Sequence, residues 1–332
     1  MKIIAILAAL CLLTTISFSQ KIHDPAQILQ IMEKSSVSYE LDVLSSPILC
    51  PDRSDNLNYN SVYRIKTDSS IMTYSYALKP EAKPFLDKAE YHFSNRNIDS
   101  ARIYYEKVLE IDPTYYKAMT YIGQMYGTKR DMDKSLEWYN KAIHANYIDY
   151  LAHWFIADIY RMKGDLKDAV DEITIAMILN RNNPRLKETR NEIYKLAKRK
   201  QDDWCFVPQY KIVSNDNSVK ISFNEIWLGY AMAKALWQYE PGYKQSMGVQ
   251  ENVYSSLEDK ECLLVLIAGL INSKTNIKKY PELTTLKKAI ERDFLNEYIF
   301  YEIVLPEHPN VAYQLSEDFI SRIKEYVLTV RN

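Results

Sequence analysis

The fold is decided between Ala82 and Asn183, where the sequence can be written as three consecutive lines of equal length: AKPFLDKAEYHFSNRNIDSARIYYEKVLEIDPTY (82–115), YKAMTYIGQMYGTKRDMDKSLEWYNKAIHANYID (116–149) and YLAHWFIADIYRMKGDLKDAVDEITIAMILNRNN (150–183). Small residues recur in two columns of these lines. They are Ala89, Gly123 and Ala157 in the first column and Ala101, Ser135 and Ala169 in the second. Two helices that cross closely need small residues at their contact, so this period predicts a stack of helix–turn–helix repeats.

Other columns support the same register. Aromatic residues follow the first small column at His92, Tyr126 and Tyr160, and a turn falls before Ile98, Met132 and Leu166. With these columns the sequence resembles the tetratricopeptide repeat family, most closely in its first copy, which ends in Glu110-Ile111-Asp112-Pro113. It departs from the family where Arg96 and Arg130 replace the turn glycine kept at Gly164. The resemblance implies three repeats and a capping helix over residues 82–201.

Composition supports a helical protein. The chain has 332 residues, of which 47% are apolar and only 7 are glycines, and its formal net charge is −1. An apolar fraction this high excludes global disorder. The scarcity of glycine disfavours folds that are rich in hairpins or that bind phosphate in a glycine-rich loop. Without a basic excess, the charge gives no reason to expect a nucleic-acid partner. The predicted class is therefore all-α.

The segment 1–19 has the pattern of a secretory signal peptide. Lys2 precedes an apolar stretch, and Ser17 and Ser19 place small residues before Gln20. We expect cleavage after Ser19 and an exported protein, periplasmic or extracellular, with an envelope-associated location left open. A retained anchor helix is the alternative. Lipidation at Cys11 is disfavoured because Leu10 stands where a small residue is required.

The remaining segments carry no family signature. Residues 20–81 begin with a helix from Asp24, continue as an extended loop over 52–60, and have an apolar and aromatic stretch over 62–77 that is expected to lie along the repeats. Residues 202–332 predict a mostly helical C-terminal domain with a short β-hairpin over 210–223. No second membrane segment is expected, because the most apolar later run, 262–271, is too short to span a bilayer.

Cysteine count permits at most one disulfide in the mature chain. Cys50, Cys205 and Cys262 remain after cleavage, an odd number in a compartment that permits disulfides. A bridge from Cys50 to Cys205 is conceivable because both lie in irregular segments, whereas Cys262 is expected to be a small apolar residue on a helix. Spacing alone does not decide the pairing.

Motifs for catalysis, cofactors and metals are missing from the sequence. It has no CxxC, HExxH, GxSxG, GxxxxGK or GxGxxG motif, and its five histidines have no metal-ligand spacing. We therefore predict a non-enzymatic protein without cofactor or metal. The rival hypothesis is an enzyme whose site lies in the C-terminal domain, with Glu225, Glu240 or Glu261 as candidate acids.

The family resemblance implies where a partner would bind. In tetratricopeptide repeats the first helix of each repeat lines a concave groove at set positions. The corresponding residues are Leu86, Glu90 and Phe93 in the first repeat, Lys117, Thr120 and Gln124 in the second, and Trp154, Asp158 and Arg161 in the third. The carboxylate-clamp subtype is rejected, because Leu86 and Glu90 stand where it requires lysine and asparagine.

These observations give a leading hypothesis, an exported scaffold that binds a peptide or protein partner in the repeat groove. An envelope assembly factor resembling the repeat proteins of outer-membrane biogenesis is a further alternative. Trp154 is either an anchor for a partner or, if residues 62–77 or the C-terminal domain fill the groove, a packed residue. The sequence leaves these two interpretations of Trp154 open.

Overall fold

The structure is a computed structural model that describes residues 22–58, 62–66, 71–200, 203–215, 218–250 and 255–331. The predicted signal peptide, 1–19, lies outside these described residues. The chain forms two compact units. Unit 1 consists of Met1–Pro51 and Asp203–Ile299, and unit 2 of Asp52–Asp202 and Phe300–Asn332. Each unit thus combines segments that the sequence-based division at 81/82 and 201/202 assigns to different regions, because strands and helices distant in sequence pack together.

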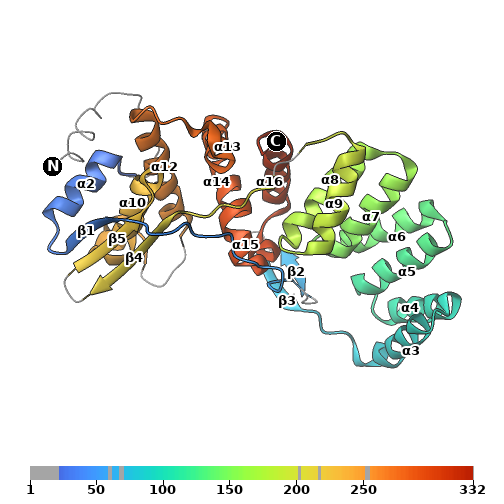
Figure 1. Cartoon of the computed structure of the whole chain (residues 1–332). Helices are drawn as coiled ribbons and strands as arrows, with labels where there is room; N and C mark the ends of the chain where they lie inside the picture. The colour runs from blue at the N-terminus through green and yellow to red at the C-terminus, as the bar shows by residue number, and fades with distance from the viewer. Residues whose placement is uncertain are drawn as a thin grey trace. The chain divides into compact units, whose positions relative to one another are not determined.

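Unit 2 contains the repeats as three helix pairs followed by a single helix (Figure 1). The pairs are α3 (Lys83–Ser94) with α4 (Ile98–Ile111), α5 (Tyr116–Thr128) with α6 (Met132–Ala145), and α7 (Tyr150–Lys163) with α8 (Leu166–Leu179), and the single helix is α9 (Pro184–Leu196). The predicted period and the capping helix are both present. The chain is mostly helical with a few short strands, as predicted.

The small residues lie where the two helices of a pair meet, as the period predicts. Ala101 and Ala169 are fully buried. In the second repeat a Cβ added to Gly123 would lie 2.5 Å from Cε1 of Tyr139, and the Ser135 hydroxyl donates to the Gly123 carbonyl at 2.5 Å. Such close approach leaves no room for a larger side chain.

The turns inside the repeats have a left-handed residue at the same position, and in two of the three repeats this residue is not glycine. Arg96, Arg130 and Gly164 occupy the same position in the three repeats, and all three have left-handed backbones, with φ of 58°, 61° and 85°. Only glycine adopts this region without steric cost. The two arginines therefore keep the turn geometry and carry its backbone strain.

Segments from both ends of unit 2 pack on the repeats. Before the repeats, strands β2 (Val62–Lys66) and β3 (Ile71–Ser75) form an antiparallel hairpin, and a 3₁₀ segment η1 (Pro80–Ala82) follows them. After the repeats come the π-helical η4 (Ile299–Val304), α15 (Leu305–Glu307), η5 (Pro309–Gln314) and α16 (Glu317–Thr329). Helix α16 packs on α8, and Nζ of Lys324 lies 3.5 Å from Oδ2 of Asp171.

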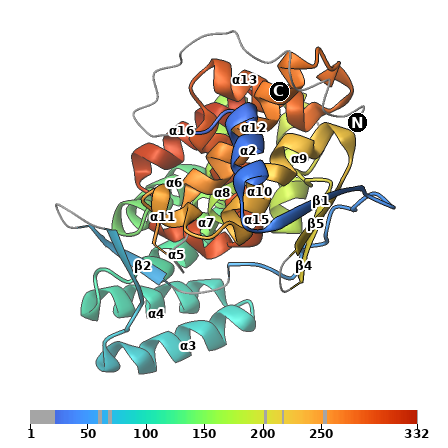
Figure 2. The ribbon, with the colours of Figure 1, turned by 90° about the vertical axis from the view of Figure 1, so that its left-hand side faces the viewer.

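Unit 1 is built on a three-stranded sheet in the order β1-β5-β4. Its elements are α2 (Pro25–Lys34), β1 (Ser38–Val43), β4 (Tyr210–Asn215), β5 (Ser218–Phe223), η2 (Glu225–Trp227), α10 (Leu228–Tyr239), α11 (Tyr243–Ser246), α12 (Ser256–Asn272), η3 (Ile277–Lys279), α13 (Pro281–Glu291) and α14 (Leu295–Tyr298). The predicted hairpin is β4–β5. The sequence analysis did not predict β1, which joins β5 in parallel, with Ser38 opposite Ser218. Helix α2 lies beside α10 and α12 (Figure 2).

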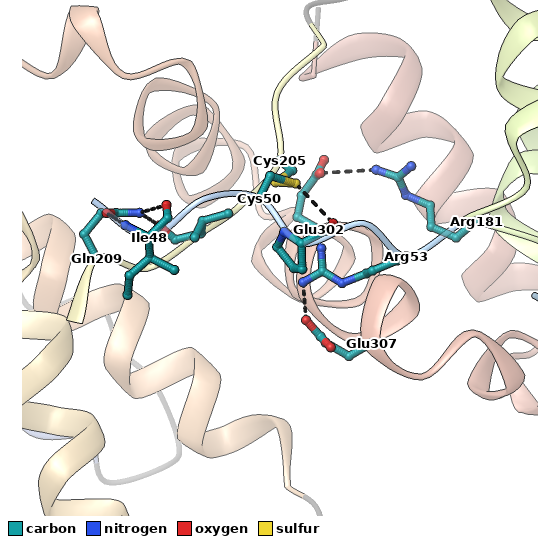
Figure 3. Close-up of a disulfide and its surroundings, with 10 residues drawn as sticks. Ile48, Cys50, Arg53, Arg181, Cys205, Gln209, Glu302 and Glu307 are labelled. Carbon is teal, nitrogen blue, oxygen red and sulfur yellow. Dashed lines mark hydrogen bonds and ion pairs between the residues drawn. A yellow bond between two sulfur atoms is a disulfide. The ribbon is translucent and has the colours of Figure 1, made fainter. Parts of the chain in front are cut away.

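One disulfide fastens the N-terminal segment of unit 1. Cys50 and Cys205 are bonded, with Cα atoms 6.4 Å apart, and Gln209 exchanges two hydrogen bonds with the backbone of Ile48 nearby (Figure 3). Cys262 is a free thiol, fully buried on α12. The pairing that the sequence left open is therefore Cys50 to Cys205. Of the helices described, not one combines the length and the hydropathy that crossing a membrane requires.

Candidate functional site

The nine predicted groove residues lie on α3, α5 and α7, the first helices of the three repeats. In the first repeat Leu86 and Phe93 are half-buried against the repeat core, and the Phe93 ring lies 5.6 Å from that of Tyr121. Glu90 is exposed and accepts a hydrogen bond of 2.9 Å from the Tyr105 hydroxyl. This repeat offers an apolar surface with one carboxylate.

In the second repeat the three predicted residues differ in exposure. Thr120 is only 2% exposed, and its hydroxyl lies 2.6 Å from Oδ2 of Asp149. Thr120 is therefore a support inside the repeats and not a surface contact. Lys117 is half-buried, and burial lowers the pKa of its amine against the opposing charges of Asp149 and Glu90. Gln124 is half-buried.

In the third repeat the predicted residues share one face of α7. Arg161 binds Oδ1 of Asp158 through Nε at 3.1 Å and Nη2 at 3.0 Å, and about a third of each side chain is exposed (33% and 32%). The half-buried Trp154 donates from Nε1 to the Thr189 hydroxyl of α9 at 3.2 Å. Trp154 thus packs on the capping helix, a partner that the sequence analysis did not consider.

Two polar contacts of the repeats, Asp149 with Thr120 and His153 with Glu172, were missed by the sequence analysis. Asp149 caps the start of α7 by accepting from the Leu151 amide, and burial raises the pKa of its carboxyl. His153, 1% exposed, has both ring nitrogens facing oxygen atoms, Nδ1 at 2.6 Å from Glu172 and Nε2 at 2.9 Å from the Tyr147 carbonyl. An aspartate just before an apolar helix is a recognised N-cap signal that could have identified Asp149.

The candidate acids of the rival enzyme hypothesis lie in unit 1. Glu261 is fully buried and accepts hydrogen bonds from the His23 amide (2.8 Å), Trp237 Nε1 (2.7 Å) and the Tyr243 hydroxyl (2.8 Å). These bonds attach the segment that begins α2 to α10, α11 and α12.

The other two candidate acids are more exposed than Glu261: Glu240 is half-buried and Glu225 is exposed. Glu240 accepts from the Ser35 hydroxyl at 2.6 Å and the Tyr39 hydroxyl at 2.8 Å, whereas Glu225 is exposed on η2. Two of the three acids therefore hold the N-terminal segment in place. Within the described ranges, no group of three or more His, Cys, Asp or Glu side chains is arranged to hold a metal ion.

A family model for the tetratricopeptide repeat matches residues 82–115 and 116–147. Residues 82–147 are tetratricopeptide repeats. The boundaries of the two matches agree with the first two helix pairs, and α7 with α8 repeats the arrangement over 150–183. Tetratricopeptide repeats are typically protein-interaction modules, because stacked helix pairs create an extended binding surface. Among curated proteins, none matches this chain.

Several solved structures are similar to this chain. The tetratricopeptide domain of Arabidopsis OM64 is 11% identical and covers 34% of this chain and 94% of its own, with a TM-score of 0.33. The first such domain of Spaghetti (RPAP3), bound to an HSP90 peptide, is 18% identical over 35% of this chain and 93% of its own (TM-score 0.34). PilF of Pseudomonas aeruginosa is 12% identical over 70% and 95% (TM-score 0.27).

Proposed function

We propose that this protein is an exported, non-enzymatic scaffold that holds a peptide or protein partner on the concave-face residues of its repeats. The observation that carries the proposal is the set Trp154, Asp158 and Arg161, which present an aromatic ring and a charged pair on one face of a repeat helix. All three are partly exposed. Tryptophan and arginine are the residue types that most often dominate binding energy in protein interfaces.

The chemistry of this face suits a partner that carries a carboxylate beside an apolar side chain. Arg161 directs two donors at a single oxygen of Asp158, a geometry that a partner carboxylate can share or replace. Trp154 is fixed by its bond to Thr189 and by the neighbouring Phe155 ring, 6.2 Å away. A fixed aromatic ring loses little conformational entropy when a partner packs on it.

Two observations in unit 1 support the other parts of the proposal. The Cys50–Cys205 disulfide is typical of proteins in oxidising compartments and agrees with export through the pattern of residues 1–19. The engagement of Glu240 and Glu261 in structural hydrogen bonds supports a non-enzymatic role, because these were two of the candidate acids.

The binding test compares Arg161→Ala with Lys141→Ala in the full chain. Both residues belong to helix ion pairs, that of Arg161 partly exposed and that of Lys141 exposed, but Lys141 pairs with Glu137 on α6, a second helix of a repeat. Each substitution is expected to change stability by less than about 1 kcal/mol. We expect Arg161→Ala to reduce partner retention in envelope cross-linking while Lys141→Ala leaves it unchanged, and equal retention by both would contradict the proposal.

Trp154→Ala gives the larger effect and needs a stability measurement beside it. Loss of an anchoring tryptophan is expected to weaken partner binding by about 2 kcal/mol or more. Ile103→Ala, a truncation at an exposed apolar residue of α4, is the control. If Trp154→Ala lowers the melting temperature strongly and partner retention falls only in proportion, Trp154 serves the capping helix and not a partner.

Export is tested on the protein recovered from its natural producer. We expect a mature N-terminus at Gln20 in an extracytoplasmic fraction, and one thiol per denatured, unreduced chain, that of Cys262. An intact Met1 in the cytosol would contradict export.

A further inference from the structure

Three buried polar residues occupy equivalent positions where the second helix of each repeat ends. Asp112, Asn146 and Asn180 are the C-cap residues of α4, α6 and α8, and they are 3%, 4% and 0% exposed. We call them the corner row. They lie at the junctions between repeats, whereas the predicted groove residues lie on α3, α5 and α7.

Every member of the corner row bonds to one segment of the chain. This segment, the strap, is the described part of residues 56–79, namely 56–58, 62–66 and 71–79. Asn180 accepts from the Asn58 amide at 3.2 Å and donates to the Asn58 carbonyl at 3.3 Å. Asn146 donates to the Val62 carbonyl at 3.0 Å, and Asp112 accepts from the Tyr76 hydroxyl at 2.8 Å and the Lys79 amide at 3.3 Å.

The described strap residues therefore contact the corner row in order, from Asn180 of the last repeat through Asn146 to Asp112 of the first. Other groups of the repeats add to this contact. The Tyr116 hydroxyl donates to the Val62 carbonyl at 3.0 Å, and Asn182 donates to the Asn56 carbonyl at 3.0 Å. Six of these seven bonds go to backbone atoms of the strap, and the side chains of Asn58 and Lys79 donate in turn to the carbonyls of Leu179, Pro309 and Ile111. A surface that forms hydrogen bonds with backbone atoms recognises the extended conformation of the bound segment and places little restriction on the sequence of that segment.

The described strap residues leave one acceptor of the corner row without a donor. Asn146 Oδ1 is buried, and no donor reaches it from the described residues, while the equivalent atom of Asn180 accepts the Asn58 amide. Asn58 Oδ1 is likewise buried without a hydrogen bond in the described part of the chain. A segment that places an amide opposite Asn146 would gain a hydrogen bond that the described strap residues do not supply.

We infer that the corner row is a second polypeptide-binding surface of the repeats, which recognises the backbone of an extended segment, and that the strap is its resident and exchangeable occupant. The inference does not depend on the concave-face proposal, since the two use different residues. It distinguishes the strap from a core element: an exchangeable occupant leaves while the helices stay folded, whereas a core element leaves only when the repeats unfold.

Hydrogen exchange on the full chain tests whether the strap detaches. We expect the Asn58 and Lys79 amides to exchange at least about tenfold faster than interior amides of α5 to α8. The double variant Asn58→Ala/Tyr76→Phe removes the strap donors to Leu179, Pro309 and Asp112 and the hydroxyl contact with Thr114, without altering the corner row. It should accelerate strap exchange by about fivefold for each bond lost. Exchange of the strap only together with the helices would overturn the inference.

Peptide binding tests whether the vacated surface is a site. The probe is a fluorescein-labelled synthetic peptide of residues 54–66, added to the full-length double variant, or to Tyr76→Phe alone if the double variant does not fold. We expect saturable binding at least about tenfold tighter than to the unaltered protein, whose surface is occupied. Adding Asn146→Leu should abolish it, and adding Asn140→Leu, an exposed asparagine of α6, should not.

The two measurements together leave no neutral outcome. A strap that opens while the peptide fails to bind shows that the corner row has no affinity for an extended chain, and the inference is then wrong. Binding that survives Asn146→Leu would place the peptide elsewhere and would also overturn it. Failure of the Arg161→Ala test has no bearing on either result.

Discussion

The repeats of unit 2 and the sheet domain of unit 1 differ in how far apart in the sequence their contacting residues are. In the repeats, Gly123 meets Tyr139 and Ser135 within a single helix pair. In unit 1, Glu261 bonds to His23, 238 residues away, and Glu240 bonds to Ser35, 205 residues away. The comparison teaches that the helix pairs of a repeat array are joined by many equivalent local contacts, whereas unit 1 depends in addition on polar bonds between segments far apart in sequence.

The strongest test of this comparison removes the buried carboxylate of unit 1. Glu261→Leu leaves the His23 amide, the Trp237 ring nitrogen and the Tyr243 hydroxyl without their acceptor, and the expected loss is about 3 to 5 kcal/mol. Hydrogen exchange should show unit 1 opening while α5 to α8 stay protected. Glu258→Gln, at a partly exposed residue of the same helix that pairs with Lys234, is the control and should have a small effect. Equal loss of protection in both units would show that they do not fold separately.

The second test breaks a local contact of the repeats. Gly123→Ala places a methyl group 2.5 Å from the Tyr139 ring, and we expect a loss of about 1 to 3 kcal/mol in thermal or denaturant unfolding. Gly269→Ala on α12 of unit 1 meets no atom within 4 Å and should instead stabilise by about 0.5 to 1 kcal/mol. Opposite signs at two helical glycines would confirm the close crossing, and similar signs would contradict it.

The third test measures how much a buried carboxylate inside the repeats lowers the free energy of unfolding when it is ionised. Burial raises the pKa of Asp149 above its ordinary 3.8, so the folded state holds this proton more tightly than the unfolded chain. The stabilising contribution is complete below pH 3.8 and is lost as the pH rises through the folded-state pKa.

Asp149→Asn removes this titration while keeping an acceptor for the Leu151 amide. The free energy of unfolding of the variant, relative to that of the unaltered protein, should rise as the pH increases above 3.8 and then level off. The total rise measures how far the pKa of Asp149 is raised, because a tenfold change in proton affinity corresponds to about 1.4 kcal/mol. Urea titrations from about pH 3.5 to 7 measure it, with Asp158→Asn as the partly exposed control. A difference that does not change with pH would show that burial does not perturb Asp149.

The smallest effect concerns the strained turns. Arg130→Gly relieves a left-handed residue with φ of 61°, and we expect a gain of about 0.5 to 1 kcal/mol, since the added freedom of the unfolded chain offsets part of the relief. Gly164→Ala at the equivalent turn should lose about 1 kcal/mol. Thermal unfolding checks both. A loss at Arg130→Gly would mean that its side chain contributes more than the strain removes.

The same difference in distance explains what the sequence could and could not indicate. The repeat period fixes helix pairs because its contacts are local, and the hairpin β4–β5 was readable because its strands adjoin in sequence. Strand β1 was missed although Tyr39, Leu41 and Val43 alternate with polar residues, which is a strand pattern. What the sequence could not indicate is its partner β5, which lies far along the chain. Parallel pairing between distant segments leaves no local pattern.

The predicted surface residues show the same limit. The family pattern assigns nine side chains to three helices, and they do lie on α3, α5 and α7, but pattern alone could not tell that Thr120 is buried beside Asp149 or that Trp154 bonds to Thr189. The corner row was visible in principle, since Asp112, Asn146 and Asn180 share the spacing of the repeats. The search for small and aromatic columns passed over a polar one.

The Cys50–Cys205 disulfide also determines what a protease can release. The bond joins residues 155 positions apart and so closes a covalent ring that contains the strap and all the repeats. A single cut anywhere inside that ring opens it without separating the chain into two molecules. Residues 22–50 therefore stay covalently attached to the rest of unit 1 after such a cut, and only a reductant breaks that covalent attachment.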